Sequence, residues 1–150
     1  MATHRLSTEH LVYAMPADSV PAVRVHSGDT VLAETAECFE NQVQSEVQPC
    51  VSIDWGHINP ATGPICGEEA EPGDRLAVFI ERIEPADQGA MTTGSAMGVF
   101  GDELRESAIC LVPIADGLVH VLNRAHPANP MIGVIGTAPE REAVPNGAPG

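Results

Sequence analysis

Apolar and polar residues alternate over short stretches of this chain, and turn residues separate the stretches. The clearest alternation covers residues 75–81, where Leu76, Val78 and Ile80 fall on one face of an extended chain and the residues between them on the other. A period of two residues predicts a half-buried β-strand. We therefore expect a strand in this stretch.

A Gly-Asp step precedes this run, and a second Gly-Asp step occurs earlier in the chain. Gly73-Asp74 opens the run just described, and Gly28-Asp29 lies within residues 23–33. Glycine tolerates positive φ, and Asp can hydrogen-bond the backbone beyond a turn. Both segments are therefore predicted to be a turn followed by a strand, and their likeness is consistent with an internal duplication.

Further short apolar runs are bounded by Pro, Gly, Asn or Asp and predict additional strands; they are residues 110–114, 117–122 and 131–135. Residues 102–107 are the only stretch expected to be helical, over one or two turns. Residues 139–150 carry three prolines and no apolar period, which predicts an extended connection or tail. The pattern as a whole predicts a mainly-β fold, a β-sandwich or barrel-like sheet with little helix.

The composition agrees with many short strands in one domain. The 150 residues are in the range of a single core, so residues 1–150 are expected to form one domain. Thirteen prolines and 14 glycines supply the turns that such strands need.

The charge and the absence of long apolar runs exclude several classes of protein. Seven Lys and Arg residues against 21 Asp and Glu residues give a net charge of -14, so nucleic acid and anionic membrane surfaces would repel the chain. No apolar stretch is long enough to span a bilayer, and the start lacks a leader pattern. A cytoplasmic location is expected. The four cysteines form no CxxC pair, which favours free thiols over disulfides.

The stretch from Asp54 to Asp74 is a predicted loop that contains candidate chemistry. Asp54 and His57 lie three residues apart, and a carboxylate with an imidazole can bind a metal or move a proton. The alternative is a surface Asp and a His bonded to a nearby carbonyl. Asn59, Thr62 and Gly63 follow in a proline-rich segment that can either hold a small polar substrate or form a tight structural turn.

Three stretches together resemble the acetamidase/formamidase family. They read SGDTVLAETAECFENQV at 27–43, NPATGPICGEEAEPGDRLAVFIERIEP at 59–85 and NPMIGVIGTAPE at 129–140, in the family's order. The family pattern has Gly where this chain has Glu69, and Asp where it has Glu37. The resemblance implies a hydrolase that cuts a small carboxylic amide, of the formamide, acetamide or lactam class, into carboxylate and ammonia or amine.

The family pattern continues past the last residue of this chain into segments rich in His, Gly and acidic residues. The resemblance therefore implies a fold and an active site that a carboxy-terminal half completes, as a separate chain from a split gene or a cleaved precursor, unless the chain is a truncated fragment. A homo-oligomer of the pair is expected. Two alternatives stay open: a non-catalytic structural subunit, and an amidase whose amino-terminal nucleophile lies on the partner chain.

We assign expected roles on this basis. Asp54 and His57 are the candidate catalytic pair and metal ligands, with zinc preferred and calcium or magnesium possible in a site richer in oxygen. The main chain at Thr62 and Gly63, with Asn59, is expected to hold the substrate amide. Second choices for hydrogen bonds to a carboxamide are Glu37, Asn41 and Gln42.

Other residues rank below these. His126, in a predicted loop, is the reserve candidate for a catalytic histidine. The cysteines are poor candidates for a nucleophile because no base is evident near them. A copper-binding sandwich of the cupredoxin type is discounted, because no His or Met closely follows Cys110 as a blue-copper site requires.

Overall fold

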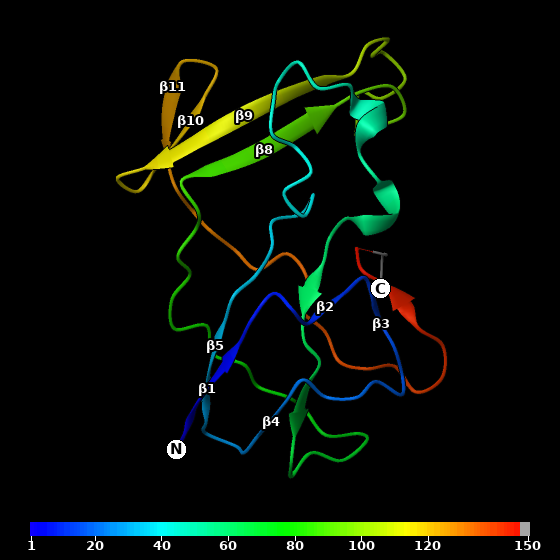
Figure 1. Cartoon of the computed structure of the whole chain (residues 1–150), viewed down its shortest axis with the longest axis vertical. Helices are drawn as coiled ribbons and strands as arrows, with labels where there is room; N and C mark the ends of the chain where they lie inside the picture. Colours follow the sequence, from blue (N-terminus) through cyan, green and yellow to red (C-terminus); the bar gives the residue numbers. More distant parts are fainter. Residues whose placement is uncertain (148–150) are drawn as a thin grey trace. The chain divides into compact units, whose positions relative to one another are not determined.

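The computed structural model describes residues 1–147, which form short strands, turns and extended segments (Figure 1). They divide into two compact units. The first unit contains Met1–Glu40, Gly56–Glu81 and the described residues from Ile132 onward, and the second contains Asn41–Trp55 and Arg82–Met131. Compactness does not test whether a unit folds alone, so the expectation of a single domain stays a prediction.

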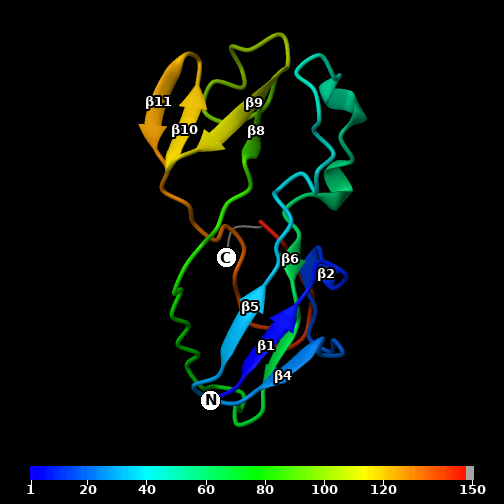
Figure 2. The same ribbon diagram turned by 60° about the vertical axis from the view of Figure 1, so that its left-hand side comes forward.

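The first unit is built from four pairs of short strands. β1 (Thr3–Leu6) pairs with β5 (Thr30–Ala33) in parallel, side by side in Figure 2, with Thr3 opposite Thr30. The other parallel pair is β4 (Val23–Val25) with β7 (Ile65–Gly67). The antiparallel pairs are β2 (Leu11–Val12) with β6 (Ala61–Thr62), and β3 (Ala14–Met15) with β12 (Val144–Pro145).

The first Gly-Asp turn fixes β1 beside β5. Gly28 has a φ of 87°, and the Asp29 amide donates to the His26 carbonyl at 3.0 Å. The Asp29 carboxylate accepts hydrogen bonds from the Ala2 amide at 2.6 Å, the His4 imidazole at 3.0 Å and the His26 amide at 3.1 Å. These bonds, led by that from Ala2, hold the pKa of Asp29 well below its usual range. The predicted turn and following strand are confirmed here.

Glu69, at a position where the family pattern has Gly, joins this turn to the loop after β7. Its carboxylate lies 2.5 Å from Nδ1 of His26 and accepts a hydrogen bond from the Ser27 amide at 3.3 Å. The hydrogen bond and the charge of Glu69 raise the pKa of His26, and the bond from His26 lowers the pKa of Glu69. Glu69, where the chain departs from the family pattern, therefore pairs with His26. This ion pair is exposed and adds little stability.

The second unit is organised by an antiparallel sheet in the order β11-β10-β9-β8. Its strands are β8 (Gln88–Thr93), β9 (Ala108–Ala115), β10 (Leu118–Val121) and β11 (Arg124–Pro127). Two-residue turns with positive φ at both positions join β9 to β10 and β10 to β11, as tight hairpins require; they are Asp116-Gly117 and Leu122-Asn123. β9 and β10 confirm the strands predicted at 110–114 and 117–122.

Residues 41–55 are tied to this sheet by side chains. The Leu111 amide of β9 donates to the Glu46 carboxylate at 2.9 Å, and Cys50 Sγ lies 3.4 Å from Thr92 Oγ1 of β8. This segment includes the 3₁₀ helix η1 (Cys50–Ser52), and η2 (Trp55–His57) follows it. Neither single turn was predicted, because three residues are too short for a helical apolar period.

Few side chains form the core of either unit. Among the described residues, the buried apolar side chains are Leu6 and Phe39 in the first unit and Val43, Ile53, Ile109 and Val112 in the second. The prediction of a mainly-β fold with little helix is confirmed. No helix in the described part of the chain is long and apolar enough to cross a membrane. The four cysteines are free thiols, as expected.

Four predicted elements differ from the structure. The loop expected from Asp54 to Asp74 contains the strands β6 and β7, which pair with β2 and β4. Residues 75–81 and 131–135 were expected to be strands, and within residues 1–147 neither stretch pairs with another strand. Their alternation is real, but a strand also needs a neighbour to accept its main-chain hydrogen bonds. Residues 102–107 form turns instead of a helix, with the Leu104 amide donating to the Phe100 carbonyl at 3.1 Å as an isolated helical turn.

The predicted tail at 139–150 is only partly described. Val144 and Pro145 form β12 against β3, so this part of the segment is anchored in the first unit. Residues 148–150 lie outside the described residues.

Candidate functional site

His57 is the last residue of η2 and belongs to the first unit. Its ring contacts an aromatic residue from far upstream in the sequence. The His57 and Tyr13 rings meet edge to face, with centroids 4.8 Å apart and planes at 87°. The Tyr13 hydroxyl donates a hydrogen bond to the Glu40 carboxylate. We refer to His57, Tyr13 and Glu40 as the Tyr13 cluster. It places an exposed imidazole against a phenol that a carboxylate holds in place.

Asn146 extends this arrangement through the main chain. Its amide donates to the Tyr13 carbonyl at 2.9 Å, and its side-chain Nδ2 donates to the Val12 carbonyl at 2.6 Å and the Asn59 carbonyl at 2.9 Å. Its Oδ1 is buried and has no hydrogen-bond partner among residues 1–147. Asn146 therefore fixes the backbone of Asn59, a predicted substrate-binding residue, next to that of Tyr13.

The turn that contains Asn59 is held on its other side as well. Asn59 has a φ of 52°, and its amide donates to the Cys38 carbonyl at 2.7 Å. Asparagine adopts this left-handed conformation more readily than most residues. Its half-buried side chain comes from a turn whose backbone is held in place, and its expected binding role stays a prediction.

Thr62 and Gly63 belong to a firmly bonded stretch. The Thr62 hydroxyl donates to the Glu34 carbonyl at 2.8 Å, and the buried Gly63 amide donates to the His10 carbonyl at 2.9 Å. The Gly63–Pro64 peptide bond is cis. These polar groups hold neighbouring segments of the first unit together, and their expected contact with a substrate stays a prediction.

Asp54, Gln42 and Asn41 lie in the second unit. Gln42 brackets Asp54: its Oε1 accepts from the Asp54 amide at 2.7 Å, and its Nε2 donates to the Asp54 carbonyl at 3.3 Å. The Asn41 carbonyl accepts from Gln44 Nε2 at 2.7 Å. The backbone of Asp54 is thus fixed and its side chain is exposed. Asp54 and His57 fall in different compact units, and their pairing stays a prediction.

Glu37 shapes the turn that carries Cys38. Its carboxylate accepts from the Phe39 amide at 2.9 Å, and its carbonyl accepts from the Glu40 amide at 2.9 Å. Partial burial of the thiol, followed by the charge of and hydrogen bond to Glu37, raises the pKa of Cys38 to about 11. Cys38 is therefore a weak nucleophile at neutral pH, in agreement with the low rank given to the cysteines.

The described residues do not make a metal site by themselves. Nowhere in residues 1–147 do three or more His, Cys, Asp or Glu side chains gather as ligands for one ion. Zinc sites in proteins use three or four protein ligands. Asp54 and His57 would have to be joined by ligands from outside the described residues.

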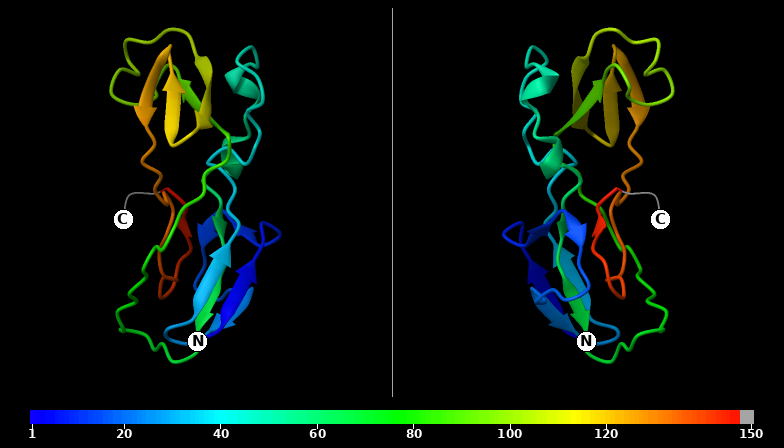
Figure 3. Two further views of the ribbon diagram at one scale, coloured as in Figure 1. Left: turned by 90° about the vertical axis from the view of Figure 1, so that its left-hand side faces the viewer. Right: turned by 90° about the vertical axis from the view of Figure 1, so that its right-hand side faces the viewer.

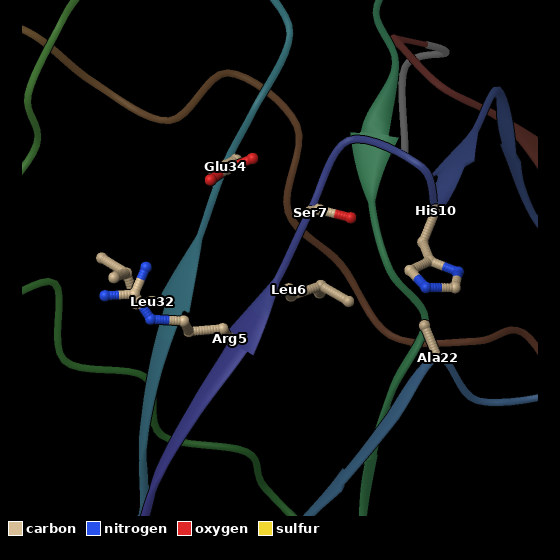
Figure 4. A pocket seen from close by; sticks show the side chains of 7 residues that line it. All are labelled: Arg5, Leu6, Ser7, His10, Ala22, Leu32 and Glu34. Carbon is tan, nitrogen blue, oxygen red and sulfur yellow. The ribbon is translucent and has the colours of Figure 1, made fainter.

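A pocket occurs in the first unit, and none of the predicted site residues lines it (Figure 4). Its volume is about 240 Å³, and its lining residues are Arg5, Leu6, Ser7, His10, Ala22, Leu32 and Glu34. None of these was predicted as a site residue. Two of them, His10 and Glu34, supply the carbonyls that hold Gly63 and Thr62, so the pocket shares its framework with the predicted substrate loop.

Sequence reasoning missed Tyr13, Glu40 and Asn146. Tyr13 is the single tyrosine of the chain, and Asn146 follows a proline near its end, but no spacing connects either residue with His57. Glu40 lies within one of the three family-like stretches, and that position was the available signal. His126, the reserve candidate, was expected in a loop and lies instead in β11 of the second unit, where it pairs with β10.

Comparison with known proteins places these features in a family. The profile of the Acetamidase/Formamidase family matches residues 11–146, and the chain belongs to this family. This confirms the resemblance found in the sequence. No curated protein matches the chain.

Solved structures agree over nearly the whole chain. Acetamidase from Bacillus halodurans is 42% identical, with a TM-score of 0.93 over 97% of this chain and 50% of that one. A predicted acetamidase/formamidase from the thermophile Thermoanaerobacter tengcongensis is 41% identical, with a TM-score of 0.90 over 95% of this chain and 48% of that one. Acetamidase from Yersinia enterocolitica, at 24% identity, shares the fold with a TM-score of 0.82 over 95% and 48% of the two chains. The chain spans about half the length of the structures it matches.

Proposed function

We propose that this chain is the amino-terminal part of an amidase that hydrolyses a small carboxylic amide to carboxylate and ammonia or amine. Formamide, acetamide and small lactams are the substrate class. The observation that carries the proposal is the family match over residues 11–146, together with 42% identity to a protein described as an acetamidase.

The active site is completed by a carboxy-terminal half, on a separate or cleaved chain, and pairs of halves form a homo-oligomer. Support comes from the matched structures, which contain about as much chain again beyond the part that this chain covers. It comes also from His57 and Asp54, whose side chains are exposed here. Amide hydrolysis benefits from a site that excludes bulk water, and a second half would provide that cover.

In this proposal each candidate residue has its own role in hydrolysis. Hydrolysis requires that water attack the carbonyl and that the leaving nitrogen receive a proton. The His57 imidazole moves the proton, with its ring held by Tyr13 and Tyr13 held by Glu40. Asp54 assists in proton transfer. The substrate carboxamide is bound by Asn59, Thr62 and Gly63, with Glu37, Asn41 and Gln42 as second choices.

A divalent metal belongs to the proposal only if the missing half supplies further ligands. Asp54 and His57 would then be two ligands of a larger set, with zinc the first choice and calcium or magnesium the alternatives. Metal analysis of the assembled protein by mass spectrometry, before and after dialysis against a chelator, tests this part separately.

The second candidate is a non-catalytic structural subunit, favoured by one observation. The Thr62 hydroxyl and both polar atoms of the Gln42 side chain are engaged with the protein's own backbone. Polar groups used in this way support a scaffold. The partner would then carry the whole of the chemistry, including an amino-terminal Ser, Thr or Cys nucleophile if its first residue is one of these.

The test is ammonia release by the protein from its own cells. The tagged chain is purified with whatever it binds, the copurifying chain is identified by mass, and formamide, acetamide and a five-membered lactam are offered as substrates. We expect release of ammonia from a linear amide, or ring opening of the lactam, by the assembly and not by the chain expressed alone. An assembly that turns over none of these amides contradicts the proposal.

A further inference from the structure

The two Gly-Asp turns of the first unit share two hydrogen bonds. At the second turn, Gly73 has a φ of 101°, and the Asp74 amide donates to the Glu71 carbonyl at 3.0 Å. The Asp74 carboxylate in turn accepts from the Glu71 amide at 2.9 Å, as the Asp29 carboxylate accepts from the His26 amide. The two turns therefore direct the residues after them in the same local manner.

The segments after the two turns differ in their pairing. The first turn leads into β5, whose main chain pairs with β1. The second leads into residues 74–81, which pair with no strand within residues 1–147. In Figures 2 and 3 this green segment runs apart from the paired strands of the first unit. It has the turn and the alternation of a strand and lacks only a neighbour.

The apolar side chains of this segment are exposed. Leu76 is 67% exposed and Phe79 is 86% exposed, and Val78 and Ile80 are exposed as well. A run of exposed apolar residues with unpaired main chain is a template for pairing with another strand. Monomeric proteins usually shield such a segment with charge, proline or a covering element.

A second stretch of the first unit shares these properties. Residues 132–135 pair with no strand in the described part of the chain, and Ile132 and Ile135 are exposed. Gly136, directly after them, lies against Met15, since a Cβ placed there would come within 2.9 Å of the Met15 sulfur. The end of the stretch is thus held to the unit while its apolar side chains face outward.

The accessible surface of the chain is larger than two globules of this mass would expose, which is consistent with an interface for a partner. The chain exposes 11372 Å². Two separate globules with the masses of the two units would expose only about 8,800 Å² between them. The difference, about 2,600 Å², is slightly above one partner's usual share of a large obligate interface, about 1,000–2,500 Å².

We propose that residues 74–81 and 132–135 are docking strands for the carboxy-terminal half of an acetamidase/formamidase-family protein, which pairs with their main chain and covers their apolar side chains. Addition of a strand to unpaired main chain is a common mode of recognition. The occupant is inferred from the matched structures, in which one chain of about twice this length contains the fold seen here and a similar amount of other protein. The inference rests on the part of the proposed function that gives this chain a carboxy-terminal partner.

The test compares hydrogen exchange in two preparations of the full chain. One is the tagged chain purified from its own cells with its partner, and the other is the chain expressed alone. The amides of residues 74–81 and 132–135 are expected to exchange within seconds in the chain alone and to become protected by at least about a hundredfold when the partner pairs with them.

Charged substitutions provide the matched comparison. Val78→Asp with Ile80→Asp should reduce the copurified partner at least about tenfold, because a carboxylate would have to be buried at the interface. Val20→Asp is the control, since Val20 belongs to the same unit and is 87% exposed outside both docking segments. The control should keep the partner.

The docking strands would be overturned if no other chain copurified, or if this chain formed a dimer with itself alone. They would also be overturned if the partner protected only amides outside residues 74–81 and 132–135. Retention of the partner by the Val78/Ile80 variant, or loss of as much partner by the Val20 control, would overturn them as well. An assembly that forms through these strands and hydrolyses no amide contradicts the amidase instead. An active assembly that survives the Val78/Ile80 substitutions contradicts the docking strands alone.

Discussion

The His57 imidazole packs edge to face against the Tyr13 ring, with centroids 4.8 Å apart. Tyr13 in turn donates a hydrogen bond to Glu40. The candidate catalytic imidazole is thus held by a residue that belongs to another part of the sequence. An aromatic contact of this kind contributes about 0.5–1.5 kcal/mol beyond the area it buries.

Substitutions at Tyr13 separate the ring from its hydroxyl. Tyr13→Phe keeps the contact with His57 and loses the bond to Glu40, so we expect kcat of the assembled amidase to fall about tenfold or less. Tyr13→Ala removes the ring contact with His57 and should lower kcat further, by about a hundredfold. Both should leave KM nearly unchanged. Equal kcat in wild type and Tyr13→Ala would remove Tyr13 from any role in positioning His57.

Gln42 is predicted to stabilise the loop at Asp54. Its side chain makes two hydrogen bonds to the Asp54 backbone, so Gln42→Ala should cost about 1–3 kcal/mol in the free energy of unfolding. Urea titration followed by circular dichroism measures the change. Gln44→Ala is the control, because the Gln44 side chain donates to one carbonyl only, that of Asn41. An equal effect of the two substitutions would show that the two bonds to Asp54 add nothing specific.

Asp29 should make stability depend on acid. Its pKa is lowered in the folded chain by hydrogen bonds from Ala2, His4 and His26. A carboxyl with a lowered folded pKa stabilises the fold above its unfolded pKa of about 3.9, and this contribution is lost as the pH falls through the folded value. Asp29→Asn should therefore lower the urea midpoint at pH 7 and differ progressively less from wild type below about pH 4. A difference that does not change with pH would mean that the charge of Asp29 is not involved.

Cys38 is predicted to react slowly with alkylating agents. A thiol with a pKa of about 11 holds roughly a hundredth of the thiolate that an ordinary cysteine holds at pH 8. Iodoacetamide labelling followed by peptide mass mapping should find Cys38 about a hundredfold slower than a free cysteine peptide. Glu37→Gln should speed its labelling, because the neighbouring negative charge is removed. Labelling at the ordinary rate in the wild type would contradict the raised pKa.

The sequence predicted strands best where the two partners are neighbours along the chain. β9 and β10 are joined by a two-residue turn, so residues 110–114 and 117–122 find each other locally. Residues 75–81 have an equally clear alternation and form no strand here. Alternation reports which face is apolar, whereas pairing depends on a neighbour that the same residues do not specify.

The candidate site was predictable only in its local part. Asp54, His57 and Asn59 are close in sequence, and the loop that carries them was recognised from its prolines and glycines. Thr62 was expected in the same loop and lies instead in β6. The contact of His57 with Tyr13, and the bond from Asn146 to the Asn59 carbonyl, join segments that are distant along the chain. Such contacts follow from strand pairing, which brings β2 beside β6 and β12 beside β3.

The central claim is that His57 serves an amidase site that a second half completes, and the most direct measurement is kcat of the assembled protein with and without this imidazole. His57→Ala is compared with His120→Ala, an exposed histidine on β10 of the second unit, with formamide and acetamide as substrates. We predict that kcat falls by about a hundredfold or more in His57→Ala, on the order of a lost general acid–base catalyst, and stays near wild type in His120→Ala. Wild-type kcat in a His57→Ala assembly that retains its partner would contradict the account.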